Sequence, residues 1–297
     1  MKKLLLALMA SAAALLGACG GDTVPEGEAE INEIRIALLI DEGNPESGQV
    51  FEDFRQGLED HIGLPVTIIP EATHLIGIEA MRAGNLEIMW GSPFVYLLAD
   101  QATDAVRLAV TENPASINKA VFITAQDHIQ SLSDIQGETF AFITPSSSSG
   151  FLYPMYHLMN EFGKDNDQIL SGDFFSTVAF SGSQDASVMG VVHGDYAVAA
   201  VGNLNLQNFI ASGMIQEDQV RILDSTEIIP FPGYIASTRV PEALRAQIQD
   251  FILAYDNDHY FEVRFRDPNV RFVEPNEATM DHLRSMVQAL DIDLEEQ

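Results

Sequence analysis

The sequence predicts an α/β protein with two units, each built on a doubly wound, mostly parallel β-sheet. Two observations lead to this prediction. Apolar runs of strand length alternate with amphipathic segments of helix length, and the alternation occurs in two separate stretches of the chain. The 297 residues, 46% hydrophobic and 20% charged, are also enough for two domains of ordinary size.

The first stretch opens with a near-continuous apolar run at 34–40, the pattern of a strand that is buried on both faces of a parallel sheet. Apolar residues at helix spacing follow over 49–62. The strand-then-helix order recurs twice, over 64–69, 75–83, 86–90 and 93–99. Since ligands bind beyond the carboxyl ends of the strands in such sheets, we expect a binding crevice at the ends of these three strands.

The second stretch contains four more strand-like runs, at 119–124, 140–143, 176–180 and 196–201. A helix rich in alanine, valine and methionine separates the last two. The chain then runs back, and amphipathic helices at 241–254 and 277–290 are expected to pack on the first unit. The C-terminal part of the chain is therefore predicted to complete the first unit.

The N-terminus has the features of an export signal. Two lysines precede an apolar run at 4–16, and small residues lead from there to Cys19. This pattern resembles a bacterial lipoprotein signal, which predicts a signal peptide at 1–18, a lipid on Cys19 and a polar tether at 19–32. The alternative is an ordinary signal peptide followed by an incidental cysteine. Because Cys19 is the only cysteine, the folded part has no disulfide, catalytic thiol or thiolate metal site.

The chain is strongly acidic, with 44 Asp and Glu against 15 Lys and Arg and a formal net charge of −29. Loss of the signal peptide would remove two lysines and leave 13 basic residues, for a net charge of about −31. This charge excludes nucleic acid as a natural partner and argues against electrostatic binding to anionic lipids. We interpret most of the carboxylates as a solvated surface. Such charges are screened beyond ~8 Å, so an anion can still bind at a recessed helix N-terminus.

The serine run at 146–149 is the most informative motif. It lies between the strand-like run at 140–143 and a helix-periodic segment, which places it on a strand-to-helix turn. There the first backbone N–H groups of the helix lack partners and the helix dipole is positive, an arrangement that suits an oxyanion. Hydroxyls and amides would then form an anion site without lysine or arginine. The alternative is an ordinary serine N-cap with spare serines in the loop.

Other candidate residues have equally plain alternatives. Phe51 and Tyr96, on the helices after the first and third strands, can both face the predicted crevice, or each can pack in the core. His157, in the helix after the serines, is expected to be a surface histidine, because no acid is placed to orient it as a catalytic base. No histidine pair has metal-ligand spacing and no nucleophile elbow or phosphate loop occurs, so we expect no cofactor and no metal.

Taken in order, these motifs resemble the phosphonate-, phosphite- and phosphate-binding proteins of ABC importers. The most specific element is the turn Pro145-Ser-Ser-Ser-Ser-Gly150. The segments 80–96 and 181–186, the latter reading Ser-Gly-Ser-Gln-Asp-Ala, add to the resemblance, which covers nearly all of the mature chain.

The resemblance implies a two-lobed periplasmic-binding-protein (Venus-flytrap) fold that closes on its ligand about a two-segment hinge. Lobe 1 would comprise 33–113 plus 228–297, and lobe 2 would comprise 114–227. The implied ligand-binding residues are Phe51, Tyr96, Ser146, Ser147, Ser148, Ser149, Gln184, Asn203 and Tyr234. The implied partners are ABC permease subunits. We expect a monomer at the extracytoplasmic face of the cell envelope, held to the membrane by the lipid on Cys19.

Departures from the family pattern bear on the ligand. Gln184 stands where family members commonly have histidine, so a neutral amide replaces a titratable donor. Aminoalkylphosphonate binders use acidic residues for the ligand amine, and none occurs in the corresponding regions around Asn203 and Tyr234. We therefore expect phosphate, phosphite or methylphosphonate as the ligand. The alternative functions are a sensor module for a membrane kinase and a surface-anchored serine phosphoesterase or esterase.

Overall fold

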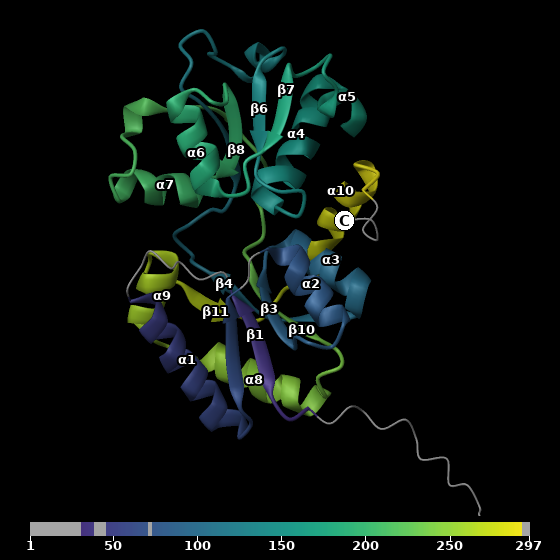
Figure 1. Cartoon of the computed structure of the whole chain (residues 1–297), viewed down its shortest axis with the longest axis vertical. Coiled ribbons are helices and arrows are strands. Elements are labelled where there is room, and N and C mark those ends of the chain that lie inside the picture. Colours follow the sequence, from purple (N-terminus) through teal and green to yellow (C-terminus); the bar gives the residue numbers. More distant parts are fainter. Residues whose placement is uncertain (1–30, 39–45, 71–72, 293–297) are drawn as a thin grey trace, which may run out of the picture. The chain divides into compact units, whose positions relative to one another are not determined.

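The computed structural model of the chain describes residues 31–38, 46–70 and 73–292. The predicted signal peptide, Cys19 and nearly all of the predicted tether lie outside these residues. The described part contains two mixed β-sheets, each covered by helices on both faces (Figure 1). We call sheet A with its helices lobe 1, and sheet B with its helices lobe 2.

Sheet A has six strands in the order β11-β4-β10-β3-β1-β2. They are β1 (Ile34–Leu38), β2 (Val66–Pro70), β3 (Ile88–Gly91), β4 (Ala105–Glu112), β10 (Gly233–Ser237) and β11 (Arg271–Val273). β1 pairs in parallel with β2 and β3, as the sequence predicts, whereas β10 is antiparallel to β3 and β4. β4 and β11 were not predicted, because a charged residue interrupts the apolar pattern of β4 and β11 is only three residues long.

Helices cover both faces of sheet A. They are α1 (Ser47–Ile62), α2 (His74–Arg82), α3 (Pro93–Thr103), α8 (Glu242–Ala254), α9 (Asp258–Phe265) and α10 (Thr279–Ala289). Helices α1, α8 and α9 enclose one core, whereas α2, α3 and α10 contribute to another. The two predicted C-terminal helices are α8 and α10. The short α9 between them was not predicted.

Sheet B has five strands in the order β7-β6-β8-β5-β9. They are β5 (Ala120–Thr124), β6 (Thr139–Phe142), β7 (Thr177–Phe180), β8 (Val198–Gly202) and β9 (Arg221–Ser225). β6 pairs in parallel with β7 and β8, and β5 is antiparallel to β8 and β9. The parallel half of this sheet therefore brings three successive carboxyl ends to one edge.

The helices of lobe 2 lie on the two sides of sheet B, with α4 and α5 on one side and α6 and α7 on the other (Figure 1). Their bounds are α4 (Tyr153–Phe162), α5 (Asn166–Leu170), α6 (Gln184–His193) and α7 (Asn203–Ala211). Three short helical segments complete the lobe, namely the 3₁₀ segments η1 (Leu132–Ile135) and η3 (Glu217–Gln219) and the π-helical turn η2 (Ser148–Leu152). Within the described ranges, no helix combines the length and apolarity that crossing a bilayer requires.

Two segments connect the sheets, one between β4 and β5 and the other between β9 and β10. They run side by side and exchange backbone hydrogen bonds. The Ile229 N–H of the second segment donates to the Asn118 carbonyl of the first (2.8 Å), and the Thr111 N–H at the end of β4 donates to the Pro232 carbonyl of the second segment (2.9 Å). The predicted lobe boundaries, after 113 and after 227, fall within these two segments.

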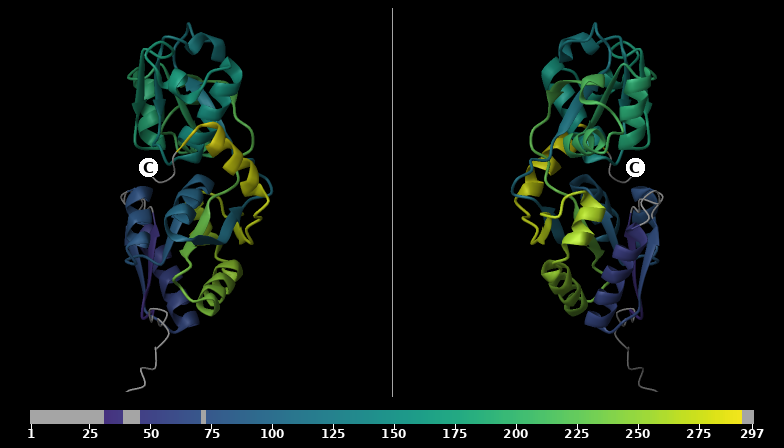
Figure 2. Two further views of the ribbon diagram at one scale, coloured as in Figure 1. Left: turned by 90° about the vertical axis from the view of Figure 1, so that its right-hand side faces the viewer. Right: turned by 90° about the vertical axis from the view of Figure 1, so that its left-hand side faces the viewer.

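The largest apolar core contains residues of both lobes. Phe94 of α3, Phe151 of η2 and Met286 of α10 all belong to it. Helix α10, yellow in Figure 2, contacts both α3 and α4. The predicted packing of this helix on the first unit is therefore only part of its role, because it also packs on a helix of lobe 2.

Candidate ligand-binding site

The carboxyl ends of β6, β7 and β8 bring the serine run and Gln184 together. The chain leaves β6 into the serine turn, and it leaves β7 into α6, whose first residue is Gln184. The Gln184 Nε2 donates to Ser149 Oγ (3.2 Å), and the Gln184 Oε1 accepts from the Gly202 N–H at the end of β8 (2.9 Å). Both polar atoms of this amide are thus used to tie the serine turn to the neighbouring strand.

The serine turn begins with Ser147, whose N–H donates to the Thr144 carbonyl (3.0 Å) and whose Oγ accepts from the Gly150 N–H (2.9 Å). This is the N-cap that the simpler interpretation of the serines predicts. The turn that follows is π-helical and precedes α4, whereas the sequence predicted a direct entry into an α-helix. Single π-helical turns occur frequently at functional sites. The N–H groups of Ser148 and Ser149 make no hydrogen bond among the described residues.

Gly150 allows the turn to pack against the end of β6. A Cβ at this position would lie 2.4 Å from the Cβ of Ile143, closer than real Cβ atoms approach. The Ile143 N–H also donates to the Gly150 carbonyl (3.0 Å), so the backbone is held at this short separation. Only glycine fits here without displacing the serines.

Ser148 reaches the N-terminus of α3 in lobe 1. Its Oγ accepts from the Phe94 N–H (3.0 Å) and donates to Ser92 Oγ (3.0 Å), and the residue is only 3% exposed. Ser92 is the N-cap of α3 and Pro93 follows it. Two helical N-termini, one from each lobe, therefore meet at one hydroxyl group. Each carries partial positive charge and unpaired N–H donors.

Ser92 and the Phe94 N–H were not among the predicted site residues. The signal was present in the sequence, because serine before proline is a common helix start. Ser146, which was predicted, is 5% exposed and its Oγ lies 3.4 Å from Thr144 Oγ1. No charged side chain forms a hydrogen bond with any of the four serines in the described ranges.

Asn203 and Tyr234 have their polar groups engaged elsewhere. The Asn203 Oδ1 accepts from the Lys119 N–H (2.8 Å) and its Nδ2 donates to the Ile117 carbonyl (2.7 Å), so this side chain holds the first connecting segment. Tyr234 is fully buried and its hydroxyl bonds to that of Tyr260 (3.0 Å). Burial raises the pKa of both phenols.

Phe51 and Tyr96 pack in different cores. Phe51 is 5% exposed and meets Tyr260 edge to face with ring centroids 6.0 Å apart. Tyr96 belongs to the core shared by the two lobes, and the Arg107 guanidinium lies 5.3 Å from its ring centroid. Burial, together with the nearby Asp100, raises the pKa of Tyr96. The core-packing interpretation of both rings thus fits the contacts, and whether either also touches a ligand stays a prediction.

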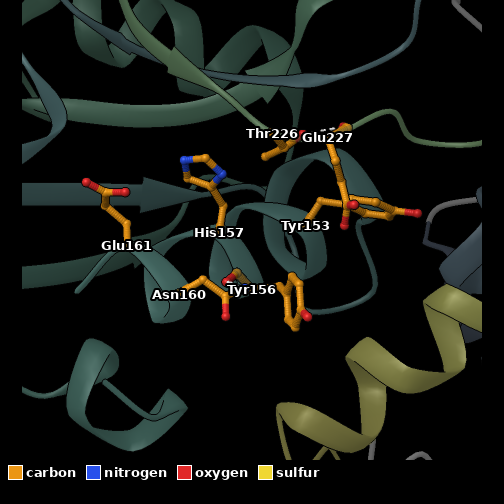
Figure 3. Close-up of a pocket in the computed structure, with 7 residues that line it drawn as sticks. All are labelled: Tyr153, Tyr156, His157, Asn160, Glu161, Thr226 and Glu227. Atoms are coloured by element: carbon orange, nitrogen blue, oxygen red, sulfur yellow. Dashed lines mark hydrogen bonds between the residues drawn. The ribbon is translucent and has the colours of Figure 1, made fainter. Parts of the chain in front are cut away.

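A cavity of about 310 Å³ lies elsewhere on lobe 2 (Figure 3). It is lined by Tyr153, Tyr156, His157, Asn160, Glu161, Thr226 and Glu227. His157 is paired with Asp224 (3.0 Å), so an orienting acid that the sequence did not place is present, but no serine bonds to this histidine in the described ranges. Two glutamates line the cavity, which makes it unsuitable for an anion.

Replacing Gly150 by alanine should lower the free energy of unfolding by about 1 to 3 kcal/mol, because the added methyl group overlaps Ile143. Chemical denaturation would measure the loss. The control is Gly172→Ala, where an added Cβ meets nothing within 4 Å. Equal stability of the two variants would contradict the close approach.

Replacing Ser148 by alanine should also destabilise the ligand-free protein, by about 1 to 3 kcal/mol, because it leaves the Phe94 N–H without its acceptor. Thermal and urea unfolding would show the change. Ser285→Ala, at an exposed serine that bonds only to the Asp281 carbonyl, should be close to neutral. If Ser148→Ala left the free energy of unfolding unchanged, the contact between the lobes would contribute little to stability.

Comparison with known proteins shows which family the chain resembles. A sequence profile for the family described as "ABC transporter, phosphonate, periplasmic substrate-binding protein" matches residues 36–279. The phosphate-import protein PhnD of Mycolicibacterium smegmatis is 24% identical over 246 residues, 79% of this chain and 77% of that protein. The phosphonates-binding periplasmic protein of Escherichia coli is 21% identical over 235 residues, 77% of this chain and 68% of that protein.

A solved structure supports the fold. PhnD1 from Prochlorococcus marinus, in complex with methylphosphonate, matches with a TM-score of 0.72 at 18% identity, covering 88% of this chain and 98% of that one. The two-lobed periplasmic-binding-protein fold is thereby confirmed. The matches support neither the sensor nor the esterase alternative: the chain is an extracytoplasmic binding protein and not an enzyme. It belongs to the family of periplasmic substrate-binding proteins of phosphonate ABC transporters.

Proposed function

We propose that the protein captures a small phosphorus oxyanion, such as phosphate, phosphite or methylphosphonate, between its lobes and delivers it to an ABC permease. The observation that carries this proposal is the meeting of two helical N-termini at Ser148. In the ligand-free chain the hydroxyl oxygen of Ser148 accepts the bond that an anion oxygen would accept. The ligand would accept from the Phe94 N–H and from the Ser148 hydroxyl, which otherwise donates to Ser92, and it would add the N–H groups of the serine turn.

The number of donors is enough for useful affinity. Hydrogen bonds to a charged group contribute about 1.5 to 3 kcal/mol each, so four or five give roughly 8 to 12 kcal/mol before costs. Ordering of side chains and closure of the lobes reduce this sum. The net free energy of binding then corresponds to a dissociation constant between micromolar and nanomolar.

The chemistry of the donors favours a tetrahedral oxyanion. Its oxygens point in several directions and can meet amides and hydroxyls from both lobes at once. Among the residues that the structure describes, no carboxylate is hydrogen-bonded to the serine turn, where it could hold a ligand ammonium group. The relatives support the same ligand class, because one is a phosphate-import protein and another was solved with methylphosphonate.

Closure about the hinge would couple binding to delivery. Donors from lobe 1 and lobe 2 reach one ligand only when the lobes are together, so the ligand stabilises the closed state by its extra contacts there. The two connecting segments are hydrogen-bonded to each other, which favours bending over independent motion of either segment. A permease can then distinguish loaded from empty protein by shape.

We also propose that the protein is a monomer tethered to the membrane by a lipid on Cys19. The lipoprotein-type signal and the only cysteine of the chain support the lipid anchor. The polar stretch after Cys19 would then separate the lobes from the bilayer.

The ligand proposal predicts a defined order of affinities. Calorimetric titration should show phosphate, phosphite or methylphosphonate binding at least tenfold more tightly than aminoethylphosphonate, because no carboxylate is bonded at the serine turn to pair the amine. Ser148→Ala should weaken the best ligand at least tenfold, and Ser285→Ala should leave it unchanged. Tighter binding of aminoethylphosphonate, or wild-type affinity in Ser148→Ala, would reject the proposed site.

The anchor is tested in bacterial cells that process lipoproteins. Metabolic labelling with a clickable palmitate analogue should label the wild-type protein, which should sediment with membranes. Cys19→Ala should abolish the labelling. Thr23→Ala, within the predicted tether, should leave both results unchanged. A wild-type protein that carries no label would contradict the anchor while leaving the ligand proposal intact.

A further inference from the structure

Arg264, on α9, lies within a cage of aromatic side chains in lobe 1. Its guanidinium carbon is 4.4 Å from the ring centroid of Trp90 and 5.1 Å from that of Phe51. The rings of Phe265, Tyr234 and Tyr260 complete the cage at 5.3 to 5.9 Å. A guanidinium that stacks on an aromatic ring contacts the ring with its flat face. Its N–H donors lie in its own plane and remain available for hydrogen bonds.

The charge of Arg264 has no acidic partner among the described residues. Its Nη1 is buried and makes no hydrogen bond. Some other arginines of the chain have an acidic partner, as Arg35 has in Glu87 and Arg107 has in Glu277. With 44 acidic residues against 15 basic ones, a partner would be easy to supply. A partly buried cation without a counter-ion is costly, and it calls for an explanation such as an absent anion.

The position of the cage is that of the ligand edge of lobe 1. Trp90 is on β3, two residues before Ser92, and Phe51 is near the start of α1, which follows β1. Arg264 therefore lies at the carboxyl ends of β1 and β3, the edge at which Ser148 meets α3. The residue is itself only partly buried.

Helix α9 is also linked to the hinge. It ends with Arg266 in the left-handed conformation, and Asp267 follows. The Asp267 Oδ2 accepts a hydrogen bond from Asn113, a buried residue of the first connecting segment. Arg264 is thus less than one helical turn along the chain from Asp267, the residue that contacts the first connecting segment.

We propose that Arg264 is the cationic contact of the ligand site on lobe 1 and binds an oxygen of the phosphorus oxyanion. This inference rests on the proposed function and adds a specificity-determining residue to it. The guanidinium fork matches two oxygens of a phosphonate or phosphate group. Its positive charge also disfavours ligands that carry an ammonium group, which is a second reason to expect discrimination against aminoalkylphosphonates.

The experiment uses Trp90 as the probe, because it is the only tryptophan of the chain and lies against Arg264. Methylphosphonate is titrated into the wild type, Arg264→Met and Arg264→Lys, with Trp90 emission and calorimetry as readouts. Arg245→Met is the matched control, since Arg245 also has one buried nitrogen without a hydrogen bond but lies on α8. In Arg264→Met the side chain still fills the cage but carries no charge. In Arg264→Lys the positive charge is kept but the paired N–H donors of the guanidinium are lost.

We expect Arg264→Met to weaken methylphosphonate binding at least tenfold, to reduce the preference over aminoethylphosphonate and to flatten the dependence of affinity on salt. Arg264→Lys should be intermediate and Arg245→Met unchanged. Without ligand, Arg264→Met should unfold at the same temperature as the wild type or higher, because an uncompensated charge has been removed. If Arg264 had a structural role instead, Arg264→Met would unfold at a lower temperature than the wild type.

The outcomes separate the two proposals. If the wild type binds no phosphorus oxyanion, the proposed function and this inference both fall. If the wild type binds and Arg264→Met binds equally well, only the inference falls. If Arg264→Met does not fold, the arginine supports the cage instead of the ligand, and the inference is overturned by that result too.

Discussion

One hydroxyl group, that of Ser148, lies where the N-termini of α3 and of the π-helical turn face each other, and it accepts from an N–H of α3. The Phe94 N–H of α3 donates to it, and Ser148 is itself the first residue of the π-helical turn. An electronegative atom between two positive dipole ends reduces the repulsion between them. The end of β6, the absence of a Cβ at Gly150 and the amide of Gln184 all serve to hold the hydroxyl there. A ligand anion reduces this repulsion more than a neutral oxygen does.

This arrangement explains how an acidic protein can bind an anion. The many carboxylates act at a distance through screened solvent, whereas amide and hydroxyl donors act at contact. Neutral donors have a further advantage, because they cost little to bury when the ligand is absent and can bond to one another, as Ser148 and Ser92 do. Arg264 is the exception: its charge is held by aromatic faces, and none of the residues that the structure describes supplies an acidic partner that would neutralise it.

Much of the fold could be predicted from local pattern, and less of the site could. The parallel strands and the serine turn were predicted because apolar runs and helix starts are visible in a few residues. The pattern could not separate Ser147 from Ser148, since one caps its own turn and the other reaches a different lobe. Asn203 and Tyr234 bond to the hinge and to Tyr260, and such partners are set by tertiary packing. Arg264 was missed for the same reason, because its cage is assembled from α1, β3, β10 and α9.

The same contacts constrain how the lobes can part. Opening must break the bonds of Ser148 to α3 and expose part of the core that Phe94, Phe151 and α10 share. The two connecting segments are expected to stay together, because a backbone hydrogen bond joins Ile229 to Asn118 and another joins the end of β4 to Pro232. Motion is therefore expected to be a bend at the two connecting segments, with α10 staying in contact with at least one lobe. A ligand that replaces the weak hydroxyl contacts by charge-assisted ones shifts the equilibrium between open and closed lobes toward the closed state. The size of the shift is set by the difference in free energy between the two sets of hydrogen bonds.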